Sequence, residues 1–165
     1  QPQCVDAKGF RDHAMLELLY ATGIRVSELI ALDVTDVDDA CIYCRSRDKC
    51  RVIPLHPTAV QALTTYLRDA RPVLIADTDE PSLFVNLSGT RMTRQGFWKL
   101  VKHYQAQAGI QKEITPHTLR QSCAVHLLEH GAALQDVREM LGLRDMSTIY
   151  TQFVRHKDNA CDPDV

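Results

Sequence analysis

The sequence lacks the long apolar run that marks a membrane-spanning helix. No stretch approaches the roughly 18 consecutive apolar residues that crossing a bilayer requires, and the first residues do not have the layout of a signal peptide. Low-complexity segments and internal repeats are also missing, whereas 45% of the 165 residues are apolar, which is ample for a core. We therefore expect one compact, soluble, cytoplasmic domain that has no membrane partner.

An excess of positive charge, which is common in nucleic-acid-binding proteins, is missing as well. The chain has 19 Lys and Arg against 21 Asp and Glu, a formal net charge of −2. The charges are unevenly placed, with acidic groups at 33–39 and 77–80 and basic groups at 45–51, 91–102 and 155–157. Because a local basic face binds phosphate even when the total charge is near zero, the composition leaves a nucleic-acid partner open.

The six cysteines lack the spacing of a metal site. Cys41 and Cys44 are followed by Cys50 and then His56. On a strand, a spacing of three places Cys41 and Cys44 on opposite faces, whereas zinc sites use close pairs of converging ligands. We predict no metal site and expect reduced thiols that are mostly packed in the interior.

The most informative stretch that is present, TPHTLRQSCAVHLLEHG, runs from Thr115 to Gly131. Thr115 suits the N-cap of a helix, Pro116 its first turn, and Gly131 the left-handed position after its end. His117 and Arg120 are three residues apart and share a face near the start, where free amides and the helix dipole favour an anion. The pattern predicts a phosphate site, and a solvated His and Arg at an ordinary helix start is the alternative.

Hydrophobic periodicity and turn residues predict a mainly α fold with a small antiparallel β-sheet, that is, the α+β class. A hairpin is expected from 42–44 and 51–53, with 33–37 as a candidate third strand. The helix from Pro57 should close before Pro72 with Val60, Leu63 and Leu67 inward, and an irregular connection should follow over 72–91. Further helices are expected at 11–22, 26–32, 93–108 and 134–141, with a last one after 145.

Five collinear blocks resemble the catalytic domain of tyrosine recombinases, and the Xer branch in particular. They are TGIRVSEL, RVIPLHP, TRQGFWKLVKHY, AGIQKEITPHTLRQS, and LLEHGAALQDVREMLG followed by STIYT. The resemblance extends over about residues 9–153. It implies a DNA breaking-rejoining domain at 11–155, preceded by a lead-in or linker remnant at 1–10 and followed by a polar tail at 156–165.

The resemblance implies a chemistry and assigns residues to it. Tyr150 would attack a DNA phosphodiester and leave a 3′-phosphotyrosine and a free 5′-hydroxyl, without metal or cofactor. Arg25 and Arg120 suit the phosphate because each guanidinium can make two parallel bonds to it, and His117 can bond the phosphate or move a proton near neutral pH. Glu28, three residues after Arg25, would orient that guanidinium.

Several positions depart from the family pattern. The hairpin lysine that acts as an acid in the family is Ser46 here, and Lys49 is a nearby substitute that is out of register. Leu143 stands where the family usually has His or Trp, Gln121 stands where a second His is usual, and the segment before Tyr150 is about two residues short. Two interpretations follow: a recombinase, with full or impaired activity, or a non-catalytic DNA-binding or regulatory protein on the same fold.

The expected partner is double-stranded DNA, and no small-molecule substrate is expected. Self-association, or pairing with a related recombinase, is expected in a DNA synapse. Members of the family carry an N-terminal helical DNA-clamping domain that does not fit into residues 1–10, so we expect either a fragment or a naturally shortened protein. Five basic residues are candidates for contacts with the DNA backbone: Arg45, Arg47, Arg94, Lys99 and Lys102.

Overall fold

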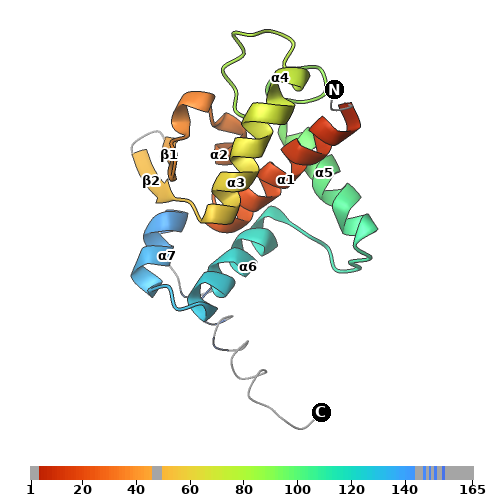
Figure 1. Cartoon of the computed structure of the whole chain (residues 1–165). Coiled ribbons are helices and arrows are strands. Elements are labelled where there is room, and N and C mark those ends of the chain that lie inside the picture. Colours follow the sequence, from red (N-terminus) through yellow and green to blue (C-terminus); the bar gives the residue numbers. More distant parts are fainter. Residues whose placement is uncertain are drawn as a thin grey trace.

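The computed structural model describes residues 4–45 and 50–143, together with residues 147, 149, 151 and 154. This part of the chain is mainly helical and contains a two-stranded antiparallel sheet (Figure 1), which confirms the predicted fold class. None of its helices is both long and apolar enough to cross a membrane. The elements are α1 (Cys4–Thr22), α2 (Val26–Ala31), η1 (Val34–Asp36), β1 (Cys41–Arg45), β2 (Cys50–Pro54), α3 (Pro57–Thr65), η2 (Tyr66–Ala70), α4 (Arg71–Leu74), α5 (Arg94–Gln107), α6 (Pro116–Glu129) and α7 (Leu134–Leu141).

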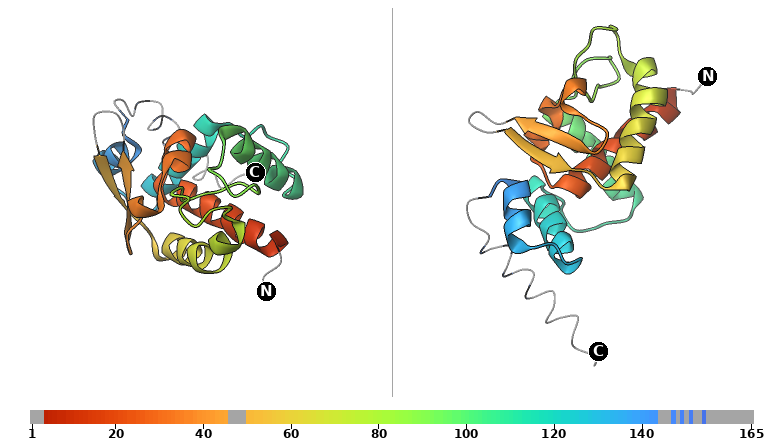
Figure 2. Two further views of the ribbon diagram at one scale, coloured as in Figure 1. Left: turned by 90° about the horizontal axis from the view of Figure 1, so that it is seen from above. Right: turned by 60° about the vertical axis from the view of Figure 1, so that its left-hand side comes forward.

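Helix α1 is the central element of the domain. It contacts α2, α3, η2, α4 and α6, and both views in Figure 2 show it surrounded by other elements. Ala14, Met15 and Leu18 are fully buried along it. The helix begins at Cys4 instead of the expected position 11, because Ala7 is also fully buried and extends the packed face toward the N-terminus.

Helix α3 continues through η2 and α4 as one rod instead of closing before Pro72. The η2 turn is a π-helical turn, the kind of local widening that accommodates irregularities within helices. Pro72 lies in the first turn of α4, where its missing N–H leaves no hydrogen bond unmade. Of the three residues expected inward, Leu63 is buried, whereas Val60 and Leu67 are half-exposed.

Among the described residues, the sheet is the predicted hairpin and has no third strand. β1 pairs antiparallel with β2, so that Cys41 lies opposite Pro54 and Arg45 opposite Cys50. The prediction of a strand over 33–37 was wrong, because this segment forms the 3₁₀ turn η1, flanked by isolated bridges. The Asp36 carboxylate accepts the N–H of Asp33 at 3.0 Å, a local bond of the kind by which Asp side chains compete with sheet formation.

Three arginines hold the irregular connection between α4 and α5. Arg11 donates to the main-chain oxygen of Val85 at 3.1 Å, and Arg71 donates to that of Ser82 at 2.9 Å. Arg91, at the end of the connection, donates to a main-chain oxygen of α2 at 2.9 Å. Guanidinium groups suit this task because they offer five donors in a fixed geometry. Arg91 therefore has a structural role, although its sequence neighbours suggested a DNA-facing group.

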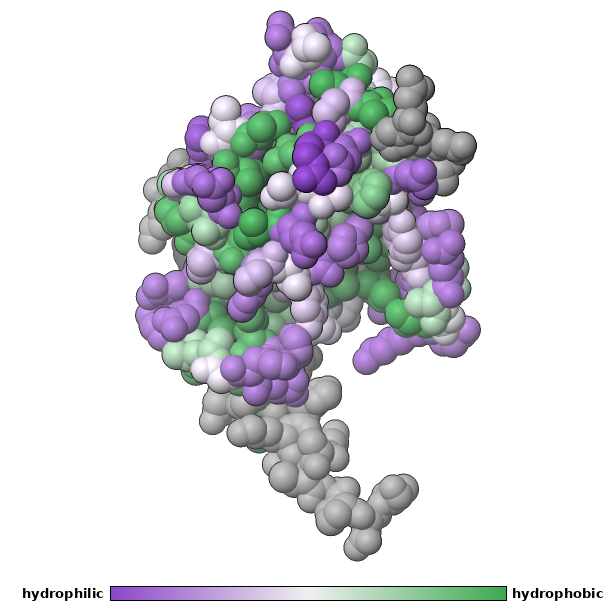
Figure 3. All heavy atoms as spheres, in the orientation of Figure 1, coloured by the Kyte–Doolittle hydropathy of each residue, from purple (hydrophilic) through white to green (hydrophobic). Residues whose placement is uncertain are grey.

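Most buried apolar residues in the described part of the chain form two separate clusters. The larger, which we call the main core, lies among α1, α2, the sheet, α3 and α5. The smaller, which we call the small core, consists of Ala124, Val125, Val137, Leu141 and Ile149. On the face shown in Figure 3, polar side chains dominate, and apolar ones gather between the sheet and α3. The structure thus joins a helical unit of α6 and α7 to a larger body.

Two buried thiols should make the protein sensitive to alkaline pH. Burial raises the pKa of the Cys44 thiol and of the Cys123 thiol to about 11, from an ordinary value of 9.0. Unfolded thiols lose their protons first as pH rises, so the free energy of unfolding should fall between about pH 9 and pH 11, by at most about 1.4 kcal/mol per pH unit for each thiol. Urea unfolding at pH 8 and pH 10.5 measures this, and Cys123→Ala should show a shallower dependence than the parent. An equal dependence in the two proteins would contradict the assignment.

Candidate active site

Arg25 is placed by the tight junction between α1 and α2. Gly23 has a left-handed backbone with φ of 58°, and a Cβ there would lie 2.3 Å from Cδ2 of Leu141. Ile24 follows as a buried anchor, and Arg25 then takes the N-cap position of α2 with an extended backbone. The junction therefore turns the chain sharply and leaves the Arg25 side chain about half exposed.

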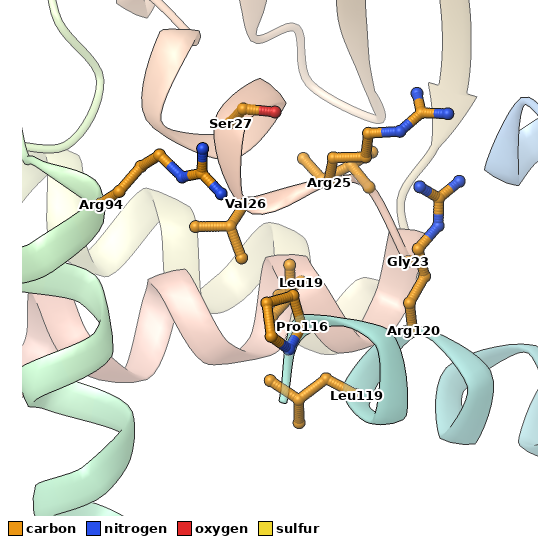
Figure 4. Close-up of a pocket in the computed structure, with 10 residues that line it drawn as sticks. Leu19, Gly23, Arg25, Val26, Ser27, Arg94, Pro116, Leu119 and Arg120 are labelled. Carbon is orange, nitrogen blue, oxygen red and sulfur yellow. The ribbon is translucent and has the colours of Figure 1, made fainter. Parts of the chain in front are cut away.

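Arg120 is placed by the first two turns of α6. The Thr115 side chain accepts the N–H of Thr118 at 3.2 Å, and Pro116 is in the first turn. Gly131, just beyond the end, has a φ of 88°. The predicted boundaries of this helix are therefore confirmed, and they bring Arg120 to the surface of α6 that faces α1 and α2 (Figure 4).

Arg25 and Arg120 line one pocket with a volume of about 270 Å³, although 95 positions separate them in the sequence. In Figure 4 their guanidinium groups lie near each other, while Arg94 reaches in from α5 on the opposite side of Val26. Ser27 also lines the pocket. Three guanidinium groups at one small pocket make a site for an anion that accepts several hydrogen bonds, such as a phosphate.

Glu28 contacts Arg25 through both of its carboxylate oxygens. Its Oε2 atom accepts the main-chain N–H of Arg25 at 2.8 Å, and its Oε1 atom lies 3.4 Å from Nη1 of the same residue. The same Oε1 atom accepts from Nη2 of Arg51 at 2.9 Å. One carboxylate therefore holds two arginines, and both of these contacts are at least partly shielded because the Glu28 side chain is only 11% exposed.

The site carries more positive charge than its single carboxylate balances. Burial lowers the pKa of Arg120, and the neighbouring positive charges of Arg25 and Arg51 lower it further, against the opposing effect of Glu28. Arginine stays charged in proteins, so the cluster holds unbalanced positive charge. An anion that entered the pocket would relieve this repulsion, which is the electrostatic condition for phosphate binding.

Arg51 adjoins the site through its bond to Glu28, and it was not singled out from the sequence. Its inward orientation could have been predicted from the sequence, because strand alternation places Arg51 on the same face as Ile53, which is fully buried. A charged side chain on the inward face of a strand needs a partner. That signal pointed to an ion pair, although it did not identify Glu28 as the partner.

The other predicted site residues are placed only in part. His117 lies in the first turn of α6, and its side chain is outside the described part of the structure. Tyr150, Lys49, Ser46 and Arg47 are outside the described residues. Arg45 is exposed and lies 2.9 Å from the Asp36 carboxylate. Lys99 and Lys102 are exposed farther along α5, and of the three basic α5 candidates Arg94 is the one that lines the pocket.

Leu143 occupies the position at which the resemblance implies His or Trp. Its side chain is half-buried and packs against the small core, and its N–H donates to the main-chain oxygen of Arg138 at 3.1 Å. An apolar side chain in this place adds packing and supplies no hydrogen bond to the pocket. Gln121, at the other departure, is buried in α6.

The fold, the hairpin and the converging arginines agree with one family of DNA-processing proteins. The model of the phage integrase family matches residues 3–160, and the chain belongs to this family. The sequence resemblance to the catalytic domain of tyrosine recombinases is thereby confirmed.

The relatives that it matches include Xer recombinases. The chain is 48% identical over 158 residues to the tyrosine recombinase XerD of Staphylococcus epidermidis, covering 94% of this chain and 53% of the relative. XerD of Staphylococcus aureus is 46% identical over the same shares. Among solved structures, XerA recombinase superposes with a TM-score of 0.79 at 31% identity, covering 98% of this chain and 63% of XerA. XerH bound to its difH substrate gives 0.73 at 26% identity, covering 99% and 48%. The chain thus spans about half the length of the curated relatives.

Proposed function

We propose that this domain binds double-stranded DNA and cleaves and rejoins one strand through a 3′-phosphotyrosine on Tyr150. The observation that carries the proposal is the convergence of Arg25 and Arg120, from distant parts of the chain, on one pocket. The proposed cleavage and rejoining take place in the cytoplasm and use no cofactor or metal. XerH was solved on its DNA substrate before cleavage, and such relatives support DNA as the substrate class.

Cleavage of a DNA phosphodiester requires cations around the phosphate. A DNA phosphodiester carries a negative charge that repels nucleophiles, and charge on the non-bridging oxygens is redistributed as the bond breaks. Arg25 and Arg120 would bond those oxygens, with Glu28 holding Arg25 in place. His117, one turn before Arg120 on α6, would bond the phosphate or assist proton transfer. The phenol of Tyr150 has an ordinary pKa near 10 and gains nucleophilicity when nearby cations stabilise its anion.

The remaining basic candidates are proposed as contacts to neighbouring DNA phosphates. Arg94 and Ser27 at the far side of the pocket would take a phosphate next to the one held by Arg25. Arg45, Arg47, Lys99 and Lys102 would contact the backbone farther away, and Lys49 would act in place of the family lysine. Lambda integrase was solved as a dimer on its core site, which supports our proposal that this domain meets a second copy, or a related recombinase, on DNA.

A second candidate function is DNA binding without cleavage. The observation that favours it is the packing of Leu143 into the small core, at the position of a side chain that should bond the phosphate. Ser46 and Gln121, at the two other departures, cannot replace a charged acid or an imidazole. In that case the arginine pocket would serve recognition alone, and the domain would regulate other recombinases at their sites.

Both functions require salt-sensitive DNA binding through the pocket. We expect a short duplex of arbitrary sequence to bind weakly, and Arg25→Ala to weaken it about five- to tenfold and to reduce the slope of log affinity against log salt by about 0.9, the value for one lost phosphate contact. Fluorescence anisotropy at several salt concentrations gives both quantities. Arg25 suits the test because its exposed side chain makes the substitution mild for the fold.

The matched control is Arg68→Ala, which removes an equal charge from an exposed side chain that pairs only with its neighbour Asp69 among the described residues. That variant should bind DNA like the parent. Equal weakening by the two substitutions would show that net charge, and not the pocket, sets the affinity. Affinity that does not change with salt would contradict phosphate recognition altogether.

A further inference from the structure

Arg51 connects three elements that carry the proposed DNA site. It extends from β2, and its Nη2 atom donates to Oε1 of Glu28 at 2.9 Å, the atom that also lies 3.4 Å from Nη1 of Arg25. The Arg51 side chain is only 17% exposed. Its Nε atom is buried and has no hydrogen-bond partner among the residues that the structure describes. Within the described part of the chain, the bond to Glu28 is therefore the one that holds this charged side chain in place.

The other side of the Arg51 guanidinium lies against the end of α7. A Cβ on Gly142 would lie 2.4 Å from Nη1 of Arg51 and 2.9 Å from Cζ. Gly142 is the left-handed C-cap of α7, with φ of 61°, and its bare backbone leaves room for the planar group. Arg120 donates to the main-chain oxygen of the preceding residue, Leu141. Two guanidinium groups thus meet at the carboxyl end of α7, the negative end of the helix dipole.

We infer that Arg51 is a positioning residue: it holds Glu28, and through it Arg25, in register with the end of α7, where Arg120 is also held. Arg51 does not line the pocket, so it acts through its neighbours. This inference rests on the proposed function, because it concerns how the phosphate-binding arginines are aligned. It explains why a buried arginine is placed among other guanidinium groups, where a hydrophobic side chain would avoid the repulsion.

Two substitutions of Arg51 test its two contacts separately. In Arg51→Met, both contacts are lost, and amide exchange at Arg25 and at Gly142 should accelerate together by about tenfold, the ratio expected when a hydrogen bond to a charged group is lost. In Arg51→Lys, the ammonium retains the charge that Glu28 needs but lacks the planar fork. Protection at Arg25 should then return to within about threefold of the parent, while Gly142 and Leu143 stay accelerated.

Hydrogen exchange of the free protein, read by NMR at single amides, tests this without DNA. Amides in the middle of α3 and α5 report global opening and should not change, and Arg68→Met is the control for removing an arginine. Unchanged exchange at Arg25 in Arg51→Met would overturn the inference, as would uniform acceleration of all slow amides or full rescue of Gly142 by Arg51→Lys.

DNA-binding measurements distinguish the positioning role of Arg51 from the proposed function. Arg51→Met should weaken binding of the arbitrary short duplex about threefold or more in the parent but less than twofold when Arg25→Ala is already present, because its effect passes through Arg25. Equal weakening in both backgrounds would overturn the positioning role for binding. If the exchange pattern appears and Arg25→Ala leaves DNA affinity unchanged, the alignment by Arg51 stands and the proposed function fails.

Discussion

Ser46→Lys should raise the rate of covalent DNA adduct formation by about 100-fold, since a positioned general acid typically contributes 10²- to 10⁴-fold. The substitution restores an ammonium at the hairpin position where the family has its lysine. Adding Leu143→His should raise the rate further by supplying a hydrogen-bond donor, at some cost in stability because Leu143 packs against the small core. Denaturing electrophoresis with a labelled, nicked duplex, selected by binding from a randomised pool, measures the adduct.

Two variants make this result specific. In Ser46→Met, the new side chain is similar in length to lysine but has no proton to donate, so the rate should stay unchanged. Tyr150→Phe should abolish the adduct in every background. If neither the parent nor the restored double variant forms an adduct while binding DNA, the non-catalytic function is the correct one. An adduct that persists in Tyr150→Phe would show that another residue is the nucleophile.

Gly23→Ala should lower the free energy of unfolding by about 3 kcal/mol. A left-handed alanine costs about 1 kcal/mol, and forcing a methyl group into a packed junction costs about 1–3 kcal/mol more. The added carbon would lie 2.3 Å from Cδ2 of Leu141 and 3.1 Å from Sγ of Cys123. The cost is large because all three positions belong to the junction between the main core and the small core. Urea unfolding followed by circular dichroism gives the value.

Gly109→Ala is the matched control for this prediction. Its φ of 66° imposes the same backbone cost, but apart from its two chain neighbours no heavy atom of the described residues lies within 4 Å of the position that a Cβ would take. It should lower the free energy of unfolding by about 1 kcal/mol. If both substitutions cost the same, the contact between Gly23 and Leu141 does not contribute, and the two cores are less tightly joined than the distances indicate.

Sequence signals were sufficient where they act locally. The cap at Thr115 and the glycine at Gly131 define both ends of α6 through bonds within a few residues, and the periodic apolar residues gave the fold class. They failed where a distant partner decides. The start of α1 depends on the burial of Ala7 against other elements. The 33–37 segment is a different case, because the signal that was overlooked there is local: the Asp36 carboxylate accepts the N–H of Asp33.

The candidate site shows the same division. The spacing of Arg25 and Glu28 allowed their interaction to be predicted, because three residues on a helix bring side chains together. Arg51 could not be joined to Glu28 from the sequence, since 23 positions separate them and only the fold sets that contact. Arg91, within the basic group at 91–102, makes contacts that also depend on the fold. Basic side chains look alike in a sequence, whether they face DNA or donate to main-chain oxygens.

The division of the interior into two cores has a consequence for how the domain behaves away from DNA. Units with separate apolar clusters can open separately, and the smaller one opens at a lower free energy. Arg25 belongs to the body with the main core, whereas Arg120 extends from the helix whose second half carries the small core. A ligand held by both would stabilise only the arrangement in which the two units are docked. A bound phosphate backbone would then hold the two units together. The small-core unit would open more readily in the free domain than in the domain bound to DNA.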